Sequence, residues 1–452
     1  MMRLSEAAKA LAISPVGTDV AIRSVSTDTR TLTEGALFVA LRGERFDGHD
    51  YVSTALARGA AAALVDADRI DASWNAPLLP VADTRRALGA LARWWRGRFD
   101  IPLATVTGSN GKTTVKEMTA AILRAHYGDE AVLATAGNYN NDIGLPLTLL
   151  RLRQTHRCAV IEIGMNHPGE TAYLADIAQP TIALVNNAQR EHQEFMRSVR
   201  DVAVEHAASI DALPADGIAV YNGDDEHAGV WRQAAGNRQV RDFGIDSQCA
   251  VHATPRLSNA GAEMEVHMPE GHTHISLRVA GLHNARNALA AAAAATAAGA
   301  SLEAVKRGLE SFEAVKGRLQ FKPGRQGSRL IDDTYNANPD SVRVAIDVLA
   351  ATDEPRVLVL GDMGEVGSDG PAFHQEIGLY AKRIGIEHLY AVGELSREAV
   401  RAFGEGAEHF DTMEALVARV RQHLPRRPCV LVKGSRFMRM ERVVEQLQAD
   451  SA

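Results

Sequence analysis

Cysteine is scarce in this chain of 452 residues, and the three cysteines, Cys158, Cys249 and Cys429, lie far apart. This spacing excludes a disulfide framework and paired metal-binding cysteines, and it suits a reducing compartment. We therefore expect the three side chains to be small core residues.

Two other features are missing, a surplus of basic charge and a long apolar run. The formal net charge is −7 at pH 7, which leaves no basic surface for nucleic acid. No apolar stretch reaches the length of a membrane span, and the opening MMRLSEAAKA lacks the apolar core of a signal peptide. We therefore expect a cytoplasmic protein with no nucleic-acid partner and no membrane-spanning segment.

The chain does contain enough apolar sequence for more than one core. Hydrophobic residues make up 46% and charged residues 23%, as in ordinary globular proteins, but the length exceeds what one core supports. Changes in hydrophobic pattern divide the chain into three α/β domains, at residues 1–83, 84–313 and 314–452. The first holds short apolar runs at 36–41, 61–65 and 78–81, and a helix over 84–98 leads out of it.

The second and third domains alternate strands with helices. Near-continuous apolar strands of this kind predict parallel sheets covered on both faces, so we expect a central parallel sheet and a doubly wound third domain. A hairpin and an alanine-rich helix, ended by Gly299, follow the central strands. The predicted strands are 103–107, 159–163, 181–186 and 217–222, then the hairpin strands 262–268 and 274–279, then 329–332, 356–360, 388–392 and 429–432; the alanine-rich helix covers 283–298.

Residues 103–118 read LATVTGSNGKTTVKEM, an apolar strand, a glycine-rich turn and a helix that begins at Lys112 or Thr113. Such a turn aims backbone N–H groups and the positive end of the helix at one point, where phosphate binds. Lys112 would reach the β- and γ-phosphates and the Thr113 hydroxyl would bind Mg²⁺, although Val106 replaces the first glycine of the general pattern. A glycine turn followed by a solvated lysine is the alternative, but the order of strand, turn, Gly-Lys-Thr and helix favours a nucleotide site. The predicted nucleotide-binding residues are Gly108, Ser109, Asn110, Gly111, Lys112, Thr113 and Thr114.

An acid and a histidine downstream complete a candidate for metal-assisted phosphoryl transfer. Glu162 falls at the end of the next predicted strand, where open α/β sheets place ligands, and His192 follows the strand after that. With Thr113, Glu162 would offer hard oxygen ligands to Mg²⁺, and His192 could hold a second metal or the acceptor. Taken alone, Glu162 could be a paired carboxylate and His192 an ordinary surface histidine.

Motifs spread over the chain resemble, in order, those of the Mur ligases. The match covers STDTR at 26–30, TGSNGKTT at 107–114, GNYNNDIGLPLTLL at 137–150, IEIGMNHPGE at 161–170, NNAQREH at 186–192, GLHNARNALAA at 281–291, KGR at 316–318, DDTYNANPDS at 332–341, GDMGEVG at 361–367 and KGSRFMRME at 433–441. The motifs are most similar to those of the member that adds D-alanyl-D-alanine to UDP-N-acetylmuramoyl-tripeptide. The resemblance implies a central P-loop ATPase domain, flanked by an N-terminal domain for the uridine nucleotide and a C-terminal domain that closes on ATP and the dipeptide.

The resemblance also implies roles for individual residues. Lys112 would contact the ATP phosphates, Thr113 and Glu162 the first Mg²⁺, His192 the second metal and Arg318 the γ-phosphate, which makes Lys112, Glu162, His192 and Arg318 the catalytic set. Asn284 and Asn287 would lie near the adenine or the hinge, and Asp333 would bind the ribose. The implied substrate-binding residues are Ser26, Thr27, Asp28, Arg30, Arg42 and Gly43 for the uridine nucleotide, Asn138 and Asn141 for the muramoyl part, and Tyr335, Asn336, Asn338 and Ser435 for the dipeptide.

One departure concerns the second metal. Several Mur ligases use a carbamylated lysine there, but this chain has no lysine between Lys116 and Lys306. We therefore expect His192 to hold that metal with water, substrate and phosphate oxygens, and with one of the nearby acids Glu191, Glu194 and Glu205. The rival ligand is a lysine from the last domain, for which Lys316 is the nearest candidate in sequence.

The activity that the resemblance implies is ATP-dependent amide ligation through an acyl phosphate, in peptidoglycan precursor synthesis, by an enzyme that we expect to be a monomer. The related ligase that adds the third residue of the stem peptide is the nearest alternative, but it usually carries Asp-Asn-Pro-Arg in its last domain, and that tetrapeptide is absent here. A nucleotide-dependent switch and a small-molecule kinase are the alternatives from other classes. The switch would leave unexplained two segments that resemble the family's uridine-nucleotide loops, STDTR at 26–30 and LRGERFDGH at 41–49.

Overall fold

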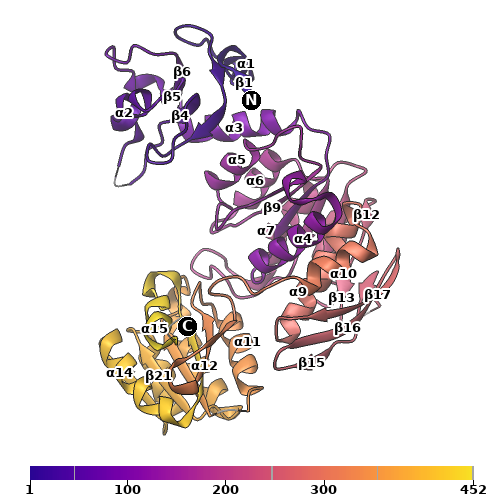
Figure 1. The fold of residues 1–452 in the computed structure, drawn as a ribbon, viewed down its shortest axis with the longest axis vertical. Helices are drawn as coiled ribbons and strands as arrows, with labels where there is room; N and C mark the ends of the chain where they lie inside the picture. The colour runs from indigo at the N-terminus through magenta and orange to yellow at the C-terminus, as the bar shows by residue number, and fades with distance from the viewer. Residues whose placement is uncertain (45, 246–247, 354, 450–452) are drawn as a thin grey trace.

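The computed structural model describes residues 1–44, 46–245, 248–353 and 355–449. Figure 1 shows three α/β units along the longest axis, with the N-terminal unit at one end, the central unit in the middle and the C-terminal unit at the other end. This α/β architecture confirms the predicted fold class.

The N-terminal unit contains a four-stranded parallel sheet in the order β3-β4-β5-β6. Its apolar strands are buried on both faces, which explains why the sequence shows continuous apolar runs there. The elements are β1 (Met2–Arg3), α1 (Leu4–Ala10), β2 (Ala21–Ile22), β3 (Ser24–Ser26), β4 (Ala36–Val39), α2 (Val52–Ala57), β5 (Ala62–Asp66) and β6 (Leu78–Val81).

Helix α3 (Thr84–Arg96) joins this unit to the central one. It begins after Asp83, whose carboxylate accepts hydrogen bonds from the N–H groups of Arg85 and Arg86 at 2.8 and 3.0 Å. Its apolar face packs on α5 (Gly144–Leu149) and α6 (Glu170–Ala178), and the buried Trp95 indole donates to the Leu152 carbonyl oxygen at 3.2 Å. One continuous core therefore runs from the N-terminal sheet into the central unit.

The central sheet has six strands in the order β12-β11-β10-β7-β9-β8, and every neighbouring pair is parallel. Helices α4, α9 and α10 cover one face, and α5 to α8 cover the other, which confirms the predicted two-sided sheet. The elements not yet given are β7 (Leu103–Thr107), α4 (Lys112–Tyr127), β8 (Val132–Ala134), β9 (Cys158–Glu162), β10 (Ile182–Val185), α7 (Val199–Asp211), β11 (Ile218–Tyr221), α8 (Ala228–Ala235), β12 (Gln239–Val240), α9 (Leu282–Ala297) and α10 (Leu302–Glu310).

A small second sheet lies over the alanine-rich helix α9, which is buried between α4, the central strands and this sheet. Its hairpin was predicted with a second strand at 274–279, and that start is wrong. Met268 pairs with Gly271, so only Pro269 and Glu270 form the turn, and short two-residue connections are the commonest hairpin turns. The strands are β13 (Phe243–Gly244), β14 (Val251–His252), β15 (Arg256–Ser258), β16 (Gly261–Met268) and β17 (Gly271–Leu277).

The C-terminal sheet has the order β18-β19-β23-β20-β21-β22, in which β18 is antiparallel and the other pairs are parallel. Helices α11 to α13 pack on one face and α14 and α15 on the other, as a doubly wound domain requires. The elements are β18 (Gln320–Pro323), β19 (Arg329–Asp333), α11 (Pro339–Ala350), β20 (Arg356–Gly361), α12 (Gly370–Arg383), β21 (His388–Val392), α13 (Ser396–Phe403), β22 (Ala407–Phe410), α14 (Met413–His423), β23 (Cys429–Lys433) and α15 (Glu441–Leu447). Strand β23 comes after the other five strands of this sheet in the chain, but it lies between β19 and β20.

Two predictions made from composition concern the cysteines and the membrane-spanning segments. Cys158, Cys249 and Cys429 are all buried, as expected of core residues. Across the described ranges, none of the helices combines the length and the apolar character that crossing a bilayer requires.

Helix α10 approaches α4 so closely that Gly308 has no room for a side chain. A Cβ built there would lie 2.5 Å from the Cα of Ile122 and 2.6 Å from its backbone nitrogen. We expect Gly308→Ala to lower the free energy of unfolding by about 1–3 kcal/mol, because α10 must move off the helix that follows the phosphate loop. Gly229→Ala is the control, since nothing lies within 4 Å of a Cβ at that helical position. Equal melting temperatures for the two variants in a thermal melt would contradict this packing.

Candidate functional site

A cavity of about 1190 Å³ opens at the C-terminal ends of the central strands and is walled by the central and C-terminal units. The phosphate-loop turn, the ends of β9 and β10, and the start of α9 form one wall, and the loops after β19 and β20 form the other. The predicted site residues that line it are Ser109, Asn110, Gly111, Lys112, Thr114, Asn138, Asn141, Glu162, His192, Asn284, Asn287, Arg318, Asp333, Tyr335, Asn336 and Asn338.

The phosphate loop has the predicted form. Strand β7 ends at Thr107, the turn follows, and α4 begins at Lys112 after Gly111 in the left-handed region at φ 81°. A Cβ on Gly111 would also come within 2.6 Å of the side-chain oxygen of Asn287 and 2.7 Å of the Asn186 amide nitrogen. Only glycine therefore allows the loop to lie this close to α9.

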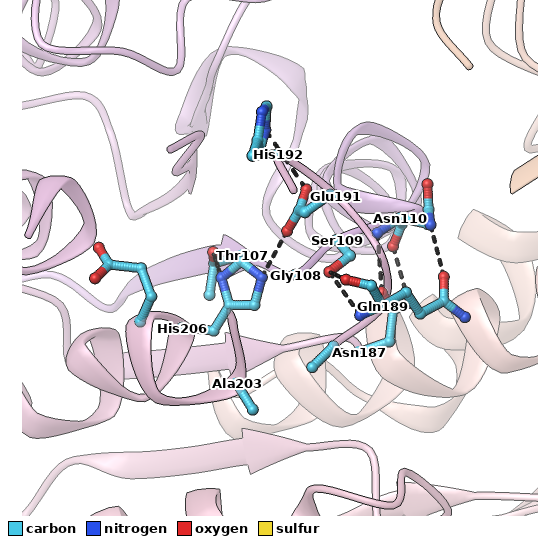
Figure 2. Close-up of polar contacts among 12 residues, drawn as sticks. Thr107, Gly108, Ser109, Asn110, Asn187, Gln189, Glu191, His192, Ala203 and His206 are labelled. Carbon is cyan, nitrogen blue, oxygen red and sulfur yellow. Dashed lines mark hydrogen bonds and ion pairs between the residues drawn. The ribbon is translucent and has the colours of Figure 1, made fainter. Parts of the chain in front are cut away.

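The segment of residues 186–192, which follows β10, supports the loop from behind (Figure 2). The Asn187 carbonyl oxygen accepts from the Ser109 N–H at 3.1 Å, and its side-chain oxygen accepts from the Asn110 N–H at 2.9 Å. The Asn186 amide donates to the Asn110 carbonyl oxygen at 2.8 Å and to Asn287 Oδ1 at 3.0 Å. These amides fix the loop between the end of β10 and the start of α9.

Lys112 folds back over the loop. Its Nζ donates to the carbonyl oxygens of Gly108 and Ser109 at 2.6 and 3.3 Å and lies 3.3 Å from Glu191 Oε2. Burial raises the pKa of Glu191, but the charge of Lys112 and a hydrogen bond from His206 more than offset this and lower it to about 2. The buried Glu191 is therefore an anion that pairs with the lysine of the phosphate loop.

Glu162 and Thr113 offer the oxygen atoms expected of a Mg²⁺ site. Glu162 Oε1 accepts from the Asn140 amide at 2.7 Å, whereas Oε2 is buried and has no hydrogen-bond partner among the described residues. The Thr113 hydroxyl accepts from Arg318 Nη2 at 2.9 Å. An unpartnered carboxylate oxygen aimed at a phosphate site fits a hard cation, which would take the place of the missing hydrogen bond.

His192 lies at the junction of the two units. Its Nδ1 is 2.7 Å from Glu365 Oε2 in the C-terminal unit, and its Nε2 is 3.8 Å from Glu191 Oε2. Of the other acids proposed for a second metal, Glu205 is engaged elsewhere, because its carboxylate accepts from the N–H groups of Gly169 and Thr171 at 2.9 and 2.8 Å. Glu191 is therefore the proposed acid whose carboxylate lies beside the His192 ring, although Glu365 lies closer to it. The rival Lys316 is exposed and does not line the cavity.

The C-terminal unit contributes the opposite wall. The guanidinium of Arg318 lies 4.1 Å from the centre of the Tyr335 ring while it reaches Thr113. Asp333 accepts from Lys433 Nζ at 2.5 Å, and the same amine donates to the Asn336 carbonyl oxygen at 2.9 Å. Sequence reasoning did not single out Lys433, although it is the first residue of the KGSRFMRME motif.

Asn338 connects the two walls. Its side-chain oxygen accepts from the Ser341 N–H at 2.8 Å and so caps α11, while its amide donates to Asn110 Oδ1 at 3.0 Å. Ser435 does not line the cavity; its buried hydroxyl accepts from the Gly364 N–H at 2.7 Å and donates to the Ala337 carbonyl oxygen at 3.0 Å. In this structure Ser435 holds the loops behind the cavity wall.

The loops predicted for the uridine nucleotide lie in the N-terminal unit and do not reach this cavity. Hydrogen bonds from Arg30 lower the pKa of Asp28 to about 2, and the Ser26 hydroxyl donates to the Asp28 carbonyl oxygen at 3.1 Å. Thr27 lies between them, half-buried. In the second loop, LRGERFDGH at residues 41–49, Arg42 pairs with Asp66 at 2.8 Å and is followed by Gly43. Arg45 of this loop lies outside the described residues.

Arg190 makes the strongest link between the central and C-terminal units, and sequence reasoning missed it. Its guanidinium contacts Asp340 at the start of α11 at 2.6 Å and Glu376 on α12 at 2.7 Å, and its backbone N–H donates to Asp340 at 2.9 Å. Hydrogen bonds to these carboxylates raise the pKa of Arg190, although burial opposes them. Its place in the NNAQREH motif was the available signal.

This geometry defines a nucleotide-dependent enzyme, with a phosphate loop on one α/β unit and an arginine brought onto it by a second. Family profiles match in the same order: "Mur ligase family, catalytic domain" at residues 21–96, "Mur ligase middle domain" at 106–295 and "Mur ligase, glutamate ligase domain" at 317–436. The chain therefore belongs to the Mur ligase family.

Individual relatives resemble this chain over nearly its whole length. The UDP-N-acetylmuramoyl-tripeptide--D-alanyl-D-alanine ligase of Escherichia coli K12 is 43% identical over 96% of this chain and 95% of that protein. The crystal structure of MurF from Acinetobacter baumannii superimposes with a TM-score of 0.90 at 34% identity and covers 98% of both chains. MurF ligase from Thermotoga maritima, solved in complex with ADP, gives a TM-score of 0.82 at 26% identity over 94% of this chain and 96% of that one.

We expect the ion pairs of Arg190 to hold the C-terminal unit against the central unit in the free protein. Removing the guanidinium in Arg190→Leu takes from Asp340 the partner it has in the central unit and leaves Glu376 with Arg343 alone, 3.3 Å away, at a cost on the order of 1–2 kcal/mol for partly exposed groups. We expect a larger radius of gyration in small-angle X-ray scattering, with unchanged secondary structure. Arg397→Leu, which removes an exposed ion pair with Asp411 inside the C-terminal unit, is the control and should scatter like the wild type. Identical scattering from Arg190→Leu and the wild type would show that these ion pairs do not hold the two units together.

Proposed function

We propose that this protein joins D-alanyl-D-alanine to UDP-N-acetylmuramoyl-tripeptide and converts ATP to ADP and phosphate. The single observation that carries the proposal is the near-complete match to relatives of that name, together with one cavity that contains the phosphate loop and residues of the C-terminal unit. The product belongs to peptidoglycan precursor synthesis. The ligase that adds the third residue is the weaker candidate, since these relatives carry the dipeptide-adding name over their full length.

The reaction has two steps. The terminal carboxylate of the tripeptide attacks the γ-phosphorus of ATP, ADP leaves, and an acyl phosphate forms. The amine of the dipeptide then attacks the acyl carbon, loses a proton, and the tetrahedral intermediate expels phosphate. Because no nucleophilic side chain is required, the chain acts by positioning the reactants, balancing charge and excluding water.

The nucleotide occupies the wall formed by the phosphate loop in this proposal. The N–H groups of the loop and the amine of Lys112 bind phosphate, and Lys112 leaves Glu191 when it does so. Arg318 already contacts Thr113 at 2.9 Å, so a small movement brings its guanidinium onto the γ-phosphate. Asp333 accepts from the ribose hydroxyls, while Asn284 and Asn287 lie on the adenine side of the cavity.

Mg²⁺ is part of the proposal because the residues fit it. The oxygen atoms of Glu162 and Thr113 would hold the first ion, and His192 with Glu191 would hold a second. The described part of the chain has no group of three or more histidine, cysteine, aspartate and glutamate side chains arranged to hold a metal, and Mg²⁺ usually keeps several waters and binds through one or two carboxylates. When bound, the ion neutralises phosphate charge.

The two remaining substrates bind on either side of the nucleotide. Asn138 and Asn141 lie on the side of the cavity that faces the N-terminal unit and hold the muramoyl part, while the loops at 26–30 and 41–49 hold the uridine nucleotide. Tyr335, Asn336 and Asn338 face the dipeptide, with Ser435 behind them as a support. The domain limits 1–83, 84–313 and 314–452, a monomeric state and a cytoplasmic location remain part of this proposal.

Removing the amine of Lys112 tests the phosphate loop. We expect Lys112→Ala to lower kcat by about 100-fold or more, since one charge that stabilises the transferring phosphate is lost, while the fold is retained. Lys306→Ala, which removes an i,i+4 pair with Glu310 on α10, serves as the control in the same phosphate-release assay. A folded Lys112→Ala enzyme with near-wild-type turnover would refute the loop assignment.

The order of the two steps predicts which mixtures release phosphate. Release should require ATP, UDP-N-acetylmuramoyl-tripeptide and D-alanyl-D-alanine together, because the dipeptide amine completes the reaction. D-alanine should substitute poorly, since it lacks the second residue that Asn336 and Asn338 are proposed to hold. Mass spectrometry of the product identifies the new amide, and equal rates with D-alanine and the dipeptide would argue against a dipeptide site.

A further inference from the structure

His206 is completely buried on α7, and both of its ring nitrogens have partners. Nδ1 lies 2.9 Å from the Thr107 hydroxyl, and Nε2 lies 2.9 Å from Glu191 Oε1 (Figure 2). Thr107 is the last residue of β7 before the phosphate loop, and Glu191 belongs to the 186–192 segment that supports the loop. The imidazole therefore bridges the end of β7 and the segment that supports the phosphate loop.

Both ring nitrogens of His206 have hydrogen-bonding partners. A carboxylate only accepts hydrogen bonds, so Nε2 donates to Glu191 Oε1, while Nδ1 is bonded to the Thr107 hydroxyl. Each polar atom of the fully buried ring is therefore paired, and it would otherwise be costly to bury.

We propose that His206 is a positioning residue, which holds the Glu191 carboxylate so that Lys112 is kept over the phosphate loop yet can move onto phosphate. The two oxygens of Glu191 have different tasks. Oε1 is fixed by His206 at 2.9 Å, and Oε2 faces the Lys112 amine at the longer distance of 3.3 Å.

The distance of 3.3 Å between Lys112 Nζ and Glu191 Oε2 is long for an ion pair. An unrestrained carboxylate would turn both oxygens toward a neighbouring ammonium and close to about 2.8 Å, the usual length of such a pair. His206 prevents that turn, because moving Oε1 toward Lys112 would break its hydrogen bond. On binding the γ-phosphate, Lys112 exchanges its hydrogen bonds to the Gly108 and Ser109 carbonyl oxygens and a long ion pair with Glu191. Without His206 that ion pair would be shorter and would hold the amine more strongly.

The inference rests on the proposed role of Lys112 at the phosphates and is tested by nucleotide binding. In isothermal titration calorimetry on the full chain, His206→Leu should bind a non-hydrolysable ATP analogue about 10–100-fold more weakly, the range expected for one hydrogen bond to a charged group. His206→Gln, whose amide can donate to the same oxygen, should recover most of the affinity. Ser209→Ala is the matched control, because that buried hydroxyl lies on the same helix and donates only to the His206 carbonyl oxygen, at 2.9 Å.

A double-mutant cycle separates positioning from simple stability. In a Glu191→Gln background, adding His206→Leu should change the affinity for the analogue by less than about twofold, since no carboxylate remains to be held. A purely structural role would lower the melting temperature and the affinity equally in both backgrounds, and that result would overturn the proposal. Wild-type affinity in a folded His206→Leu variant would overturn it as well.

Two further measurements keep the outcome clear. If His206→Leu does not fold, His206→Asn replaces it, because the shorter amide can still meet Thr107 but not Glu191, and unchanged affinity in that variant counts against the proposal. Lys112→Ala, measured in the same titration, separates a failure of this inference from a failure of the proposed phosphate-loop role. Loss of affinity in Lys112→Ala without loss in the His206 variants defeats this inference alone, whereas full affinity in Lys112→Ala defeats the phosphate-loop role itself.

Discussion

Residues 186–192 impose the constraint on which both halves of the cavity depend. Asn187 holds the phosphate loop through its backbone and its side chain, and three residues later Arg190 is paired with two carboxylates of the C-terminal unit. The peptide between them is too short to absorb a large displacement. Residues 186–192 therefore join the contacts with the C-terminal unit directly to those that support the phosphate loop.

Three of the cationic groups around the cavity are held by carboxylates, whereas Arg318 contacts the Thr113 hydroxyl and the Tyr335 ring. Lys112 faces Glu191, Lys433 is bonded to Asp333, and Arg190 is shared between two acids. Pairing of this kind limits the cost of desolvating charges before any substrate enters. It also means that an incoming anion must compete with a carboxylate for each paired cation. Binding then exchanges one ion pair for another, and the cavity does not carry these positive charges unpaired.

Local sequence patterns predicted the parts of the structure that are locally determined. The strand, glycine turn and helix around Lys112 are all written within sixteen consecutive residues, and the structure places β7 and the start of α4 where the pattern indicates. Strands β18 and β22 were missed, because edge strands such as AEHF and QFKP are half-buried and carry polar residues or proline. The hairpin start was misplaced because the turn chemistry of Pro269-Glu270 is compatible with more than one register.

The contacts that complete the site could not be inferred in the same way, since they join distant positions. Thr107 and His206 are 99 residues apart, and Arg190 and Asp340 are 150 apart. A single histidine within the apolar pattern of α7 carries no signal that distinguishes a positioning residue from a packed one. The family resemblance brought most of the lining residues together, but the ion pairs of Arg190 emerged only when the two units were seen face to face, and the bond from Lys433 to Asp333 only when β23 was seen beside β19.

The position of β23 in the C-terminal sheet has a consequence for biosynthesis. All of its sheet partners leave the ribosome first, yet they cannot close into one sheet, because the slot between β19 and β20 is filled only by residues 429–433. The strands of the central sheet, in contrast, have all been made once β12 is translated, although α9 and α10, which cover one of its faces, come later in the chain. Lys433, at the end of that late strand, is what neutralises Asp333. The C-terminal sheet and the Asp333–Lys433 pair at the cavity are thus completed only when residues 429–433 have been made.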